Sequence, residues 1–169
     1  IIQQSGTRLL DMINDVLDLS RIQSKKEVVK AGKFNLDQLL ATISSMAISL
    51  IDKKSLKFFI RKSDSVPEFI VTDQKKLQQI LINLISNAVK FTPQGKIQLN
   101  IHLIGTNLYF EVTDTGIGIE EKNLSKIFNR FHQIDSTATK KYKGTGLGLN
   151  IVKKLVELMK GEVEVESIP

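Results

Sequence analysis

The chain has 169 residues, which is enough for one domain with a substantial core and a short appended segment. Hydrophobic residues make up 41% and charged residues 25%, a balance that argues against wholesale disorder. The absence of cysteine excludes disulfides and thiolate metal sites, and it favours a reducing compartment. The net charge of +6 fits a nucleic acid or an anionic nucleotide as partner, but an aromatic content of 6% offers no platform for stacking bases. We therefore expect mostly solvated lysines on helix surfaces and no nucleic-acid partner.

The first thirty residues predict one long helix. Ile2, Leu9 and Val16 repeat at intervals of seven residues, and Leu10 and Leu17 widen the apolar stripe. A helix with such a stripe must bury it against other helices, and the rest of the chain is poorly placed to supply them. We expect the partner to be an upstream helix of a hairpin or a second chain. Because the chain begins in mid-pattern and without methionine, we interpret it as a fragment.

The next segment predicts alternating helices and strands. Asn35 is the expected cap of a helix over Leu36–Ile51. Two short strands follow, at Leu56–Arg61 and Glu68–Thr72. A strong helix is then expected over Gln74–Phe91, because its apolar residues recur at steps of three and one.

The C-terminal half predicts a β-hairpin, a polar loop and a last helix. The expected elements are strands at Ile97–Ile104 and Asn107–Asp114, a short helix at Glu121–Phe128, a loop at Gln133–Lys143, a helix at Gly146–Lys160 and a strand beginning at Glu162–Ser167.

A row of polar residues borders the apolar face of the predicted helix over Gln74–Phe91. Asn83 and Asn87 are four residues apart and Lys90 follows within one turn, so the three share one side of the helix. Two amides and an ammonium at the margin of a core indicate a pocket wall, although they also fit an ordinary helix surface. An asparagine oxygen is a plausible Mg²⁺ ligand where phosphates and water supply the rest of the octahedron.

The segment "DTGIGI", Asp114 to Ile119, directly follows a β-rich run. Gly116 and Gly118 permit backbone conformations and close approaches that a Cβ would block. A carboxylate at the end of a strand can accept a hydrogen bond from an amino group, such as that of adenine. The same pattern also fits a simple turn with a capping aspartate.

The segment "GTGLGL", Gly144 to Leu149, opens the last predicted helix. A glycine-rich helix entry presents free backbone N–H groups to phosphate, and the helix dipole assists. The spacing differs from the G-x-G-x-x-G dinucleotide fingerprint, and no Walker lysine follows. A merely flexible helix entry is the alternative.

Four motifs in order resemble the boxes of sensor histidine kinases. "LQQILINLISNAVKFT" resembles their N box, "DTGIGI" the G1 box, "IFNRF" the F box and "GTGLGL" the G2 box, while "GTRLLDMINDVLDLSRIQS" resembles the second helix of their dimerisation and phosphotransfer hairpin. The resemblance implies an α+β fold: a two-layer α/β sandwich of the Bergerat type, shared with gyrase-type, heat-shock chaperone and mismatch-repair ATPases, preceded by one long hairpin helix. It implies that residues 1–30 are part of the hairpin and that residues 31–169 are the ATP-binding catalytic domain with a truncated C-terminal strand.

The resemblance also implies ATP and Mg²⁺ as ligands. Asn87 would coordinate Mg²⁺, with the catalytic residues Asn83 and Lys90 near the phosphates, and Asp114 would accept from the adenine amino group. Arg130 or a lysine of the lid (Lys140, Lys141 or Lys143) would supply the positive charge that many relatives place at the position of Gln133. The other nucleotide-binding residues, including the phenylalanines that anchor a lid, would be Gly116, Gly118, Ile119, Phe128, Phe131, Gly144, Thr145, Gly146, Leu147 and Gly148.

The expected reaction is transfer of the γ-phosphoryl group to a histidine on a separate helix, which then feeds a response-regulator receiver domain. Neither His102 nor His132 stands in the acceptor position, so we expect no autophosphorylation of this chain. We expect a cytoplasmic catalytic domain, a parent that is either free or anchored in a membrane, and a homodimer through the N-terminal helix. The alternatives are an ATP-binding scaffold and a gyrase-like ATPase, which would need a general-base glutamate where Asn83 stands.

Overall fold

The computed structural model describes residues 27–51, 54–132 and 145–168 and, before residue 27, only Gly6, Leu10, Ile13, Val16, Leu17, Leu19, Ser20 and Ser24. The chain divides into two compact units. One comprises Lys30–Glu120 with Ser167–Pro169, and the other comprises Ile1–Val29 with Glu121–Glu166.

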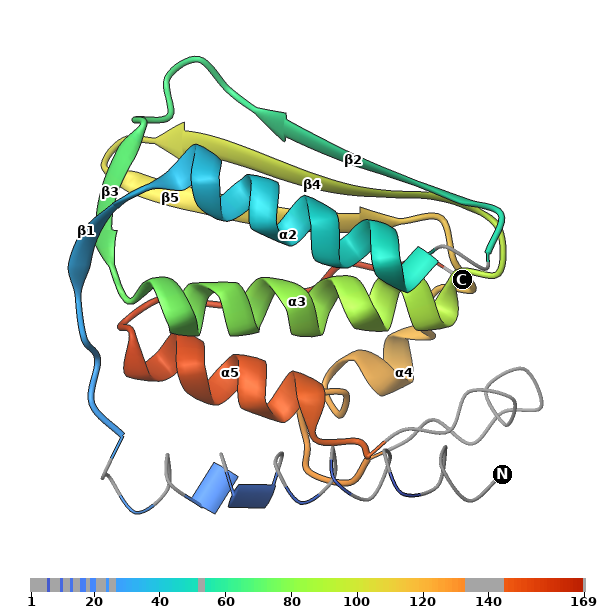
Figure 1. The fold of residues 1–169 in the computed structure, drawn as a ribbon. Helices are drawn as coiled ribbons and strands as arrows, with labels where there is room; N and C mark the ends of the chain where they lie inside the picture. The colour runs from blue at the N-terminus through green and yellow to red at the C-terminus, as the bar shows by residue number, and fades with distance from the viewer. Residues whose placement is uncertain are drawn as a thin grey trace. The chain divides into compact units, whose positions relative to one another are not determined.

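The unit over Lys30–Glu120 combines helices with two small sheets (Figure 1). Its elements in chain order are β1 (Gly32–Asn35), α2 (Leu36–Ile51), β2 (Leu56–Lys62), β3 (Phe69–Thr72), α3 (Gln74–Phe91), β4 (Gly95–Ile104) and β5 (Asn107–Asp114). Strands β2, β4 and β5 form one sheet, in which β4 runs parallel to β2 and antiparallel to β5. Strands β1 and β3 pair antiparallel as a separate ribbon.

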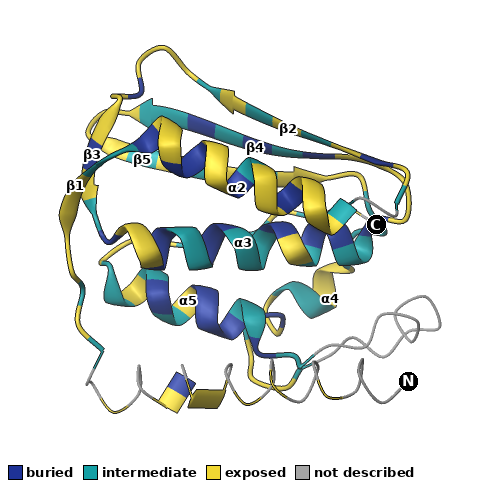
Figure 2. Ribbon diagram, in the orientation of Figure 1, coloured by how far each residue is buried: buried dark blue, intermediate teal, exposed yellow. Residues whose placement is uncertain are grey.

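One face of the three-stranded sheet is the core of this unit. Along β4, Ile97, Leu99 and Ile101 are buried, whereas the alternate residues Gln98 and Asn100 are not, as the period of a strand requires. Helices α2 and α3 cover this face with their buried sides (Figures 1 and 2). The predicted two-layer α/β sandwich is therefore confirmed, and so are the predicted bounds of α2 and α3.

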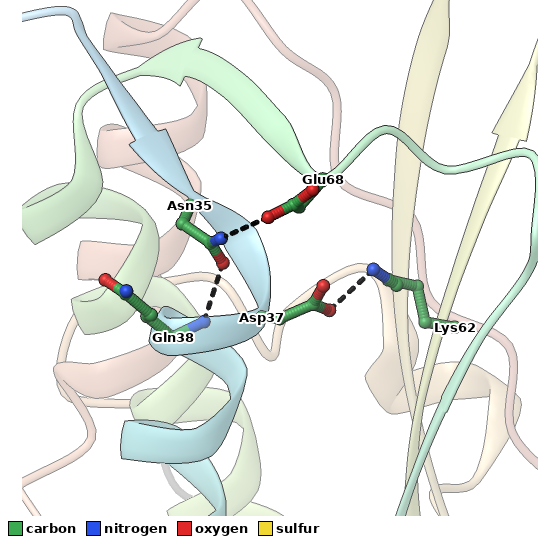
Figure 3. A network of polar contacts seen from close by, with 5 residues as sticks. All are labelled: Asn35, Asp37, Gln38, Lys62 and Glu68. Atoms are coloured by element: carbon green, nitrogen blue, oxygen red, sulfur yellow. Dashed lines mark hydrogen bonds and ion pairs between the residues drawn. The ribbon is translucent and has the colours of Figure 1, made fainter.

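Strand β1 is absent from the sequence-based prediction and is held by polar contacts at its end (Figure 3). The Asn35 side chain caps α2, because its Oδ1 accepts from the Gln38 N–H at 3.1 Å, and its Nδ2 donates to Glu68 Oε1 at 2.8 Å. The Lys62 ammonium pairs with Asp37 Oδ1 at 2.5 Å and so joins β2 to the first turn of α2. The predicted cap at Asn35 is confirmed, and the same side chain also ties β1 to the segment before β3.

Asp73 fixes the start of α3. It is buried, and its side chain accepts from the backbone N–H of Lys76 at 3.1 Å and of Lys30 at 2.8 Å. Its carboxylate also pairs with the Lys76 ammonium at 3.2 Å. Burial alone would raise the pKa of Asp73, but the two backbone hydrogen bonds and the Lys76 charge outweigh it and lower that pKa below 3.8. One carboxylate therefore caps α3 and holds the chain that enters this unit.

The other unit contains α4 (Glu121–Leu124) and α5 (Gly148–Leu158), both shorter than predicted. After α4 the chain continues in tight turns, with the Lys126 N–H bonded to Asn123 O and the Asn129 N–H to Lys126 O, because asparagine and serine favour turns over helix here. Helix α5 begins at Gly148 because Gly146 has φ +71°, which no right-handed helix accepts.

The predicted strand at Glu162–Ser167 is wrong for the part of the chain that the structure describes. Half-buried and exposed residues do alternate there, yet the segment joins neither sheet. A strand needs a ladder partner as well as the pattern, and no described strand pairs with this segment.

The predicted N-terminal helix lies mostly outside the described residues. Those described between residues 6 and 20 are helical, and the large side chains of Leu10, Ile13 and Val16 are exposed while Leu19 is buried. The predicted polar loop at Gln133–Lys143 lies outside the described residues. Among the helices that are described, none has the length and apolar character needed to cross a bilayer.

Candidate active site

Helix α3 carries the predicted polar row. Asn83, Asn87 and Lys90 are all half-buried, and the unbroken helix over Gln74–Phe91 places them on one side. Within the described residues neither asparagine side chain has a hydrogen-bond partner. These two amides are therefore available to a ligand.

Lys90 lies in the last turn of α3. Its ammonium is 4.7 Å from the centre of the Phe91 ring, a cation–π distance. Burial lowers the pKa of Lys90 below 10.5, since an ammonium is disfavoured where water is scarce. A bound anion would relieve that cost.

The C-terminal end of α3 is closed by Thr92. Pro93 disfavours the helical conformation for the residue before it, and Thr92 is accordingly extended, with φ −107° and ψ 104°. Its N–H still bonds to Ala88 O at 3.0 Å, and the Lys54 ammonium bonds to Val89 O. The last turn is thus fixed by both main-chain and side-chain donors.

Asp114, at the end of β5, is tied to that helix end. Its Oδ1 accepts from the Thr92 hydroxyl at 3.2 Å and from the Gly116 N–H at 2.8 Å. The Ile117 N–H donates to Phe91 O at 3.3 Å. The structure therefore brings the predicted adenine-binding aspartate together with the C-terminal end of the predicted metal-binding helix.

The two glycines of this loop serve different purposes. A Cβ on Gly116 would lie 2.6 Å from Phe91 O and 2.9 Å from Thr92 Oγ1, so glycine is required for the loop to approach the helix. Gly118 has φ +66°, a left-handed conformation that favours glycine. Beyond them, the Ile119 N–H donates to Ser167 Oγ at 2.9 Å. Gly116 stays a predicted nucleotide-binding residue, and within the protein it also lets the loop reach the end of α3.

The F-box segment lies in the other unit and is arranged differently. Ile127 is buried and Phe128 is half-buried, with the Lys153 ammonium 5.9 Å from its ring. Phe131 is 65% exposed and has φ +55°, a strained conformation for an aromatic residue. Arg130 is exposed. Of the two predicted anchors, Phe131 therefore does not pack in the core of the structure described.

The entry into α5 packs against Phe131. The Phe131 N–H donates to Gly146 O at 3.1 Å, and a Cβ on Gly146 would lie 3.0 Å from Phe131 Cα. Thr145 Oγ1 accepts from the Leu147 N–H at 3.2 Å, and Leu147 is fully buried. Gly148 starts the helix, and Gly144 lies outside the described residues. The F-box and G2-box residues of this unit thus form one joined loop and helix entry.

Two residues, one in each unit, contact candidate residues and were not predicted from the sequence. Thr92 is fully buried and bonds Asp114, but a threonine beside a proline gives no signal of a partner so far along the chain. Asn150 is buried, and its Nδ2 donates to Phe128 O at 2.8 Å. Its place on the apolar face of the last helix was the available signal.

The donor set on α3 fits Mg²⁺ in part. Asn87 offers one neutral oxygen, and no group of three or more histidine, cysteine or acidic residues able to hold a metal occurs among the described residues. Mg²⁺ often takes few protein ligands and completes its octahedron with water and phosphate oxygens. The residues present therefore fit a metal that arrives with a phosphate ligand.

Comparisons with known proteins agree with this arrangement. Residues 72–169 match the family described as histidine kinase-, DNA gyrase B-, and HSP90-like ATPase. The autoinducer 2 sensor kinase/phosphatase LuxQ of Vibrio vulnificus is 42% identical over 99% of the chain and 20% of its own length. Full-length ShkA, solved in complex with AMPPNP, superposes with a TM-score of 0.82 at 32% identity, over 93% of this chain and 32% of that one. Histidine kinase ThkA, solved in complex with the response regulator TrrA, gives 0.73 at 28% identity, over 95% of this chain and 43% of that one.

The chain thus spans about a fifth of the length of the curated relative that it matches. The family match begins at Thr72, the last residue of β3, and runs to the end of the chain, so it includes all four boxes. The chain therefore belongs to the histidine kinase-, DNA gyrase B- and HSP90-like ATPase family, and the relatives that it resembles there are sensor histidine kinases.

Proposed function

We propose that this chain binds ATP with Mg²⁺ and transfers the γ-phosphoryl group to a histidine on a separate helix, as the catalytic domain of a sensor histidine kinase. The observation that carries the proposal is the junction of Asp114 with the end of α3, the helix that presents Asn87. An acceptor for a purine amino group and an oxygen ligand for a phosphate-bound metal thereby belong to one compact unit. The AMPPNP complex of ShkA supports an adenine nucleotide as the ligand.

Asp114 is the proposed adenine acceptor. One of its oxygens is held by Thr92 and Gly116, so the carboxylate keeps a defined orientation. Gly118 and Ile119 continue the same loop and are proposed to border the base. A carboxylate that accepts from an amino group gives a charge-assisted hydrogen bond, which is stronger than a neutral one.

Asn87 is the proposed Mg²⁺ ligand, with Asn83 and Lys90 near the phosphates. When bound, the metal would neutralise charge on the phosphate oxygens during transfer. Lys90 supplies a partly desolvated ammonium, and anionic phosphate would restore its preference for the charged form. These three side chains would position the triphosphate, which is the main contribution a protein makes to phosphoryl transfer.

The F-box and G2-box residues are proposed to contribute the second set of nucleotide contacts. Backbone N–H groups at the start of α5 can bind phosphate, and Arg130 adds a positive charge. The residues proposed for this set are Phe128, Phe131, Gly144, Thr145, Gly146, Leu147 and Gly148.

Transfer is favoured over hydrolysis by Asn83. A gyrase-like ATPase needs a general base near the γ-phosphate to activate water, and an amide cannot act as one near pH 7. The nucleophile that attacks the γ-phosphoryl group would then be an imidazole and not water.

We also propose the wider context. Residues 1–30 would be the second helix of a dimerisation hairpin, residues 31–169 the ATP-binding domain, and the whole protein a homodimer whose catalytic domain lies in the cytoplasm. The complex of ThkA with the response regulator TrrA supports a receiver domain as the eventual phosphate acceptor.

A mixing experiment tests the proposal. The chain is incubated with γ-³²P-ATP and Mg²⁺, alone and with a separately expressed helical hairpin that carries an acceptor histidine. We expect no label on the chain, whose two histidines lie outside the acceptor motif, and acid-labile, alkali-stable label on the hairpin. An acceptor His→Gln hairpin is the matched control. Release of inorganic phosphate with no labelled hairpin would instead support an ATPase.

A further inference from the structure

The hydroxyl of Thr92 has a single described partner. Thr92 is 0% exposed, so its hydroxyl has no access to water, and it lies 3.2 Å from Asp114 Oδ1. Because an ionised carboxylate can only accept, the threonine must be the donor. The buried Thr92 hydroxyl thus donates its only hydrogen bond to Asp114, the proposed adenine acceptor.

The two oxygens of Asp114 are consequently not equivalent. Oδ1 receives both the Thr92 hydroxyl and the Gly116 N–H, the latter at 2.8 Å, and each carboxylate oxygen offers about two lone pairs. No described residue donates to Oδ2. Asp114 therefore presents only Oδ2, as a pure acceptor, to a ligand.

The backbone around this contact is fixed on both sides. Pro93 holds Thr92 in an extended conformation, and the Thr92 N–H is anchored on Ala88. Gly116 approaches so closely that a Cβ there would lie 2.7 Å from Asp114 Oδ1. The hydroxyl is held in place and does not follow the carboxylate if the carboxylate rotates.

We infer that Thr92 is a positioning residue for base selection: by holding Asp114 Oδ1, it leaves Oδ2 to accept from a 6-aminopurine and to repel a 6-oxopurine. The inference rests on the proposed function, in which Asp114 receives the base. Loss of the hydroxyl frees Oδ1 from one of its two donors and lets the carboxylate rotate. The preference for an amino group over a carbonyl oxygen then weakens, while the rest of the nucleotide is bound as before.

The test compares three nucleotides that differ in the group at purine position 6 and, for inosine triphosphate, also in the proton on N1. ATP carries an amino group there, inosine triphosphate a carbonyl oxygen and purine riboside triphosphate a hydrogen atom. Their affinities with Mg²⁺ are measured by calorimetry for the wild-type chain and for Thr92→Val, which keeps the shape of the side chain but removes the hydroxyl. Thr92→Ser keeps the hydroxyl, and Thr113→Val, an exposed threonine on β5, is the matched control.

We expect Thr92→Val to weaken ATP binding about tenfold, the value of one hydrogen bond to a charged group, and to change the affinity for purine riboside triphosphate less than about twofold. Thr92→Ser and Thr113→Val should keep the wild-type preference for ATP. In an Asp114→Asn background, Thr92→Val should add no further loss of preference, because the two residues act through one contact.

The outcomes separate the two proposals. A wild-type chain that binds ATP no better than inosine triphosphate would overturn the assignment of Asp114 to adenine and the inference with it. A wild-type preference for ATP that survives in Thr92→Val would overturn the role of Thr92 alone. Equal weakening of all three nucleotides by Thr92→Val would show a merely structural threonine. Should Thr92→Val not fold, loss of the preference in Thr92→Ser would contradict the inference, since the hydroxyl is retained there.

Discussion

The candidate residues fall into two halves, one in each compact unit, and the halves differ in how fully their polar groups are paired. At the junction of α3 with β5, the Thr92 hydroxyl donates a hydrogen bond to Asp114, and Gly116 packs so closely against both that it leaves no room for a Cβ. At the entry to α5, Phe131 is exposed in a left-handed conformation, and within the described residues Asn150 Oδ1 and His132 Nε2 are buried without partners. The Asp114 carboxylate of the first half is therefore preorganised, whereas the second half holds a left-handed aromatic residue and, among the described residues, two buried polar atoms without a partner.

The difference has a physical meaning for a nucleotide-binding protein. Strain and unsatisfied polar groups each cost about 1–3 kcal/mol and persist where a function requires them. A base-binding half that is complete before the ligand arrives can select the base.

The largest effect is expected from Asn87→Asp, which alters the preorganised half at its proposed metal ligand. The carboxylate introduced at residue 87 would repel the negatively charged phosphates, so the rate of phosphoryl transfer to the acceptor hairpin should fall by about a hundredfold or more. The fold should be unchanged, because Asn87 has no described hydrogen-bond partner to lose. The measurement is the initial rate of hairpin labelling at fixed Mg²⁺, with circular dichroism as the fold check.

Ser86→Ala is the matched control, since Ser86 is the exposed neighbour on the same helix. It should transfer at the wild-type rate. Unchanged transfer in Asn87→Asp would remove the metal assignment.

The helix that carries the preorganised half depends on Asp73, so Asp73→Ala should be the next largest effect. The change removes the cap of α3, the anchor of Lys30 and the partner of the buried Lys76 ammonium, at a cost of about 2–4 kcal/mol in the free energy of unfolding. Because the folded pKa of Asp73 lies below 3.8, its stabilisation is complete above that pH and is lost as the pH falls through the folded value. The penalty of Asp73→Ala should therefore be full at neutral pH and shrink in strong acid.

Urea unfolding across this pH range measures the penalty. Asp37→Ala is the control, because Asp37 is exposed and its ion pair with the half-buried Lys62 should contribute less than about 1 kcal/mol. Equal penalties for Asp73→Ala and Asp37→Ala would show that Asp73 does not anchor α3.

The same contrast explains how much could be predicted from sequence. Helices α2 and α3 and the hairpin of β4 and β5 have local signals, namely apolar periodicity, the Asn35 cap and a short turn, and their positions are confirmed. The polar row on α3 and the aspartate after β5 were likewise visible as motifs. Features that depend on distant partners were not: β1 exists only through its pairing with β3, and Thr92 gains its role from Asp114.

The errors fall mainly in the second unit, and they have a common physical reason. The sequence from residue 121 to residue 131 reads as helix at its start, but asparagines and a left-handed Phe131 bend it into turns. The segment at Glu162–Ser167 has strand alternation without a ladder partner among the described strands. An alternating pattern does not show whether a neighbouring strand is present to pair with it. A left-handed backbone at a phenylalanine cannot be predicted from the residue type.

The smallest effect is expected from relieving that strain with Phe131→Gly. Glycine adopts the observed φ of +55° without a clash, so the substitution should raise the free energy of unfolding by up to about 1 kcal/mol. The greater conformational entropy of glycine in the unfolded chain reduces this gain. Little packing is lost, since the ring is 65% exposed.

Phe131→Ala separates the loss of the ring from the relief of backbone strain, because it removes the same ring but keeps a Cβ in the left-handed conformation. Urea unfolding should place Phe131→Gly above Phe131→Ala in stability, while nucleotide affinity falls in both if the ring contacts the ligand. If Phe131→Gly were less stable than Phe131→Ala, the left-handed conformation would carry no strain in solution. The contrast between the two halves would then rest on Asn150 and His132 alone.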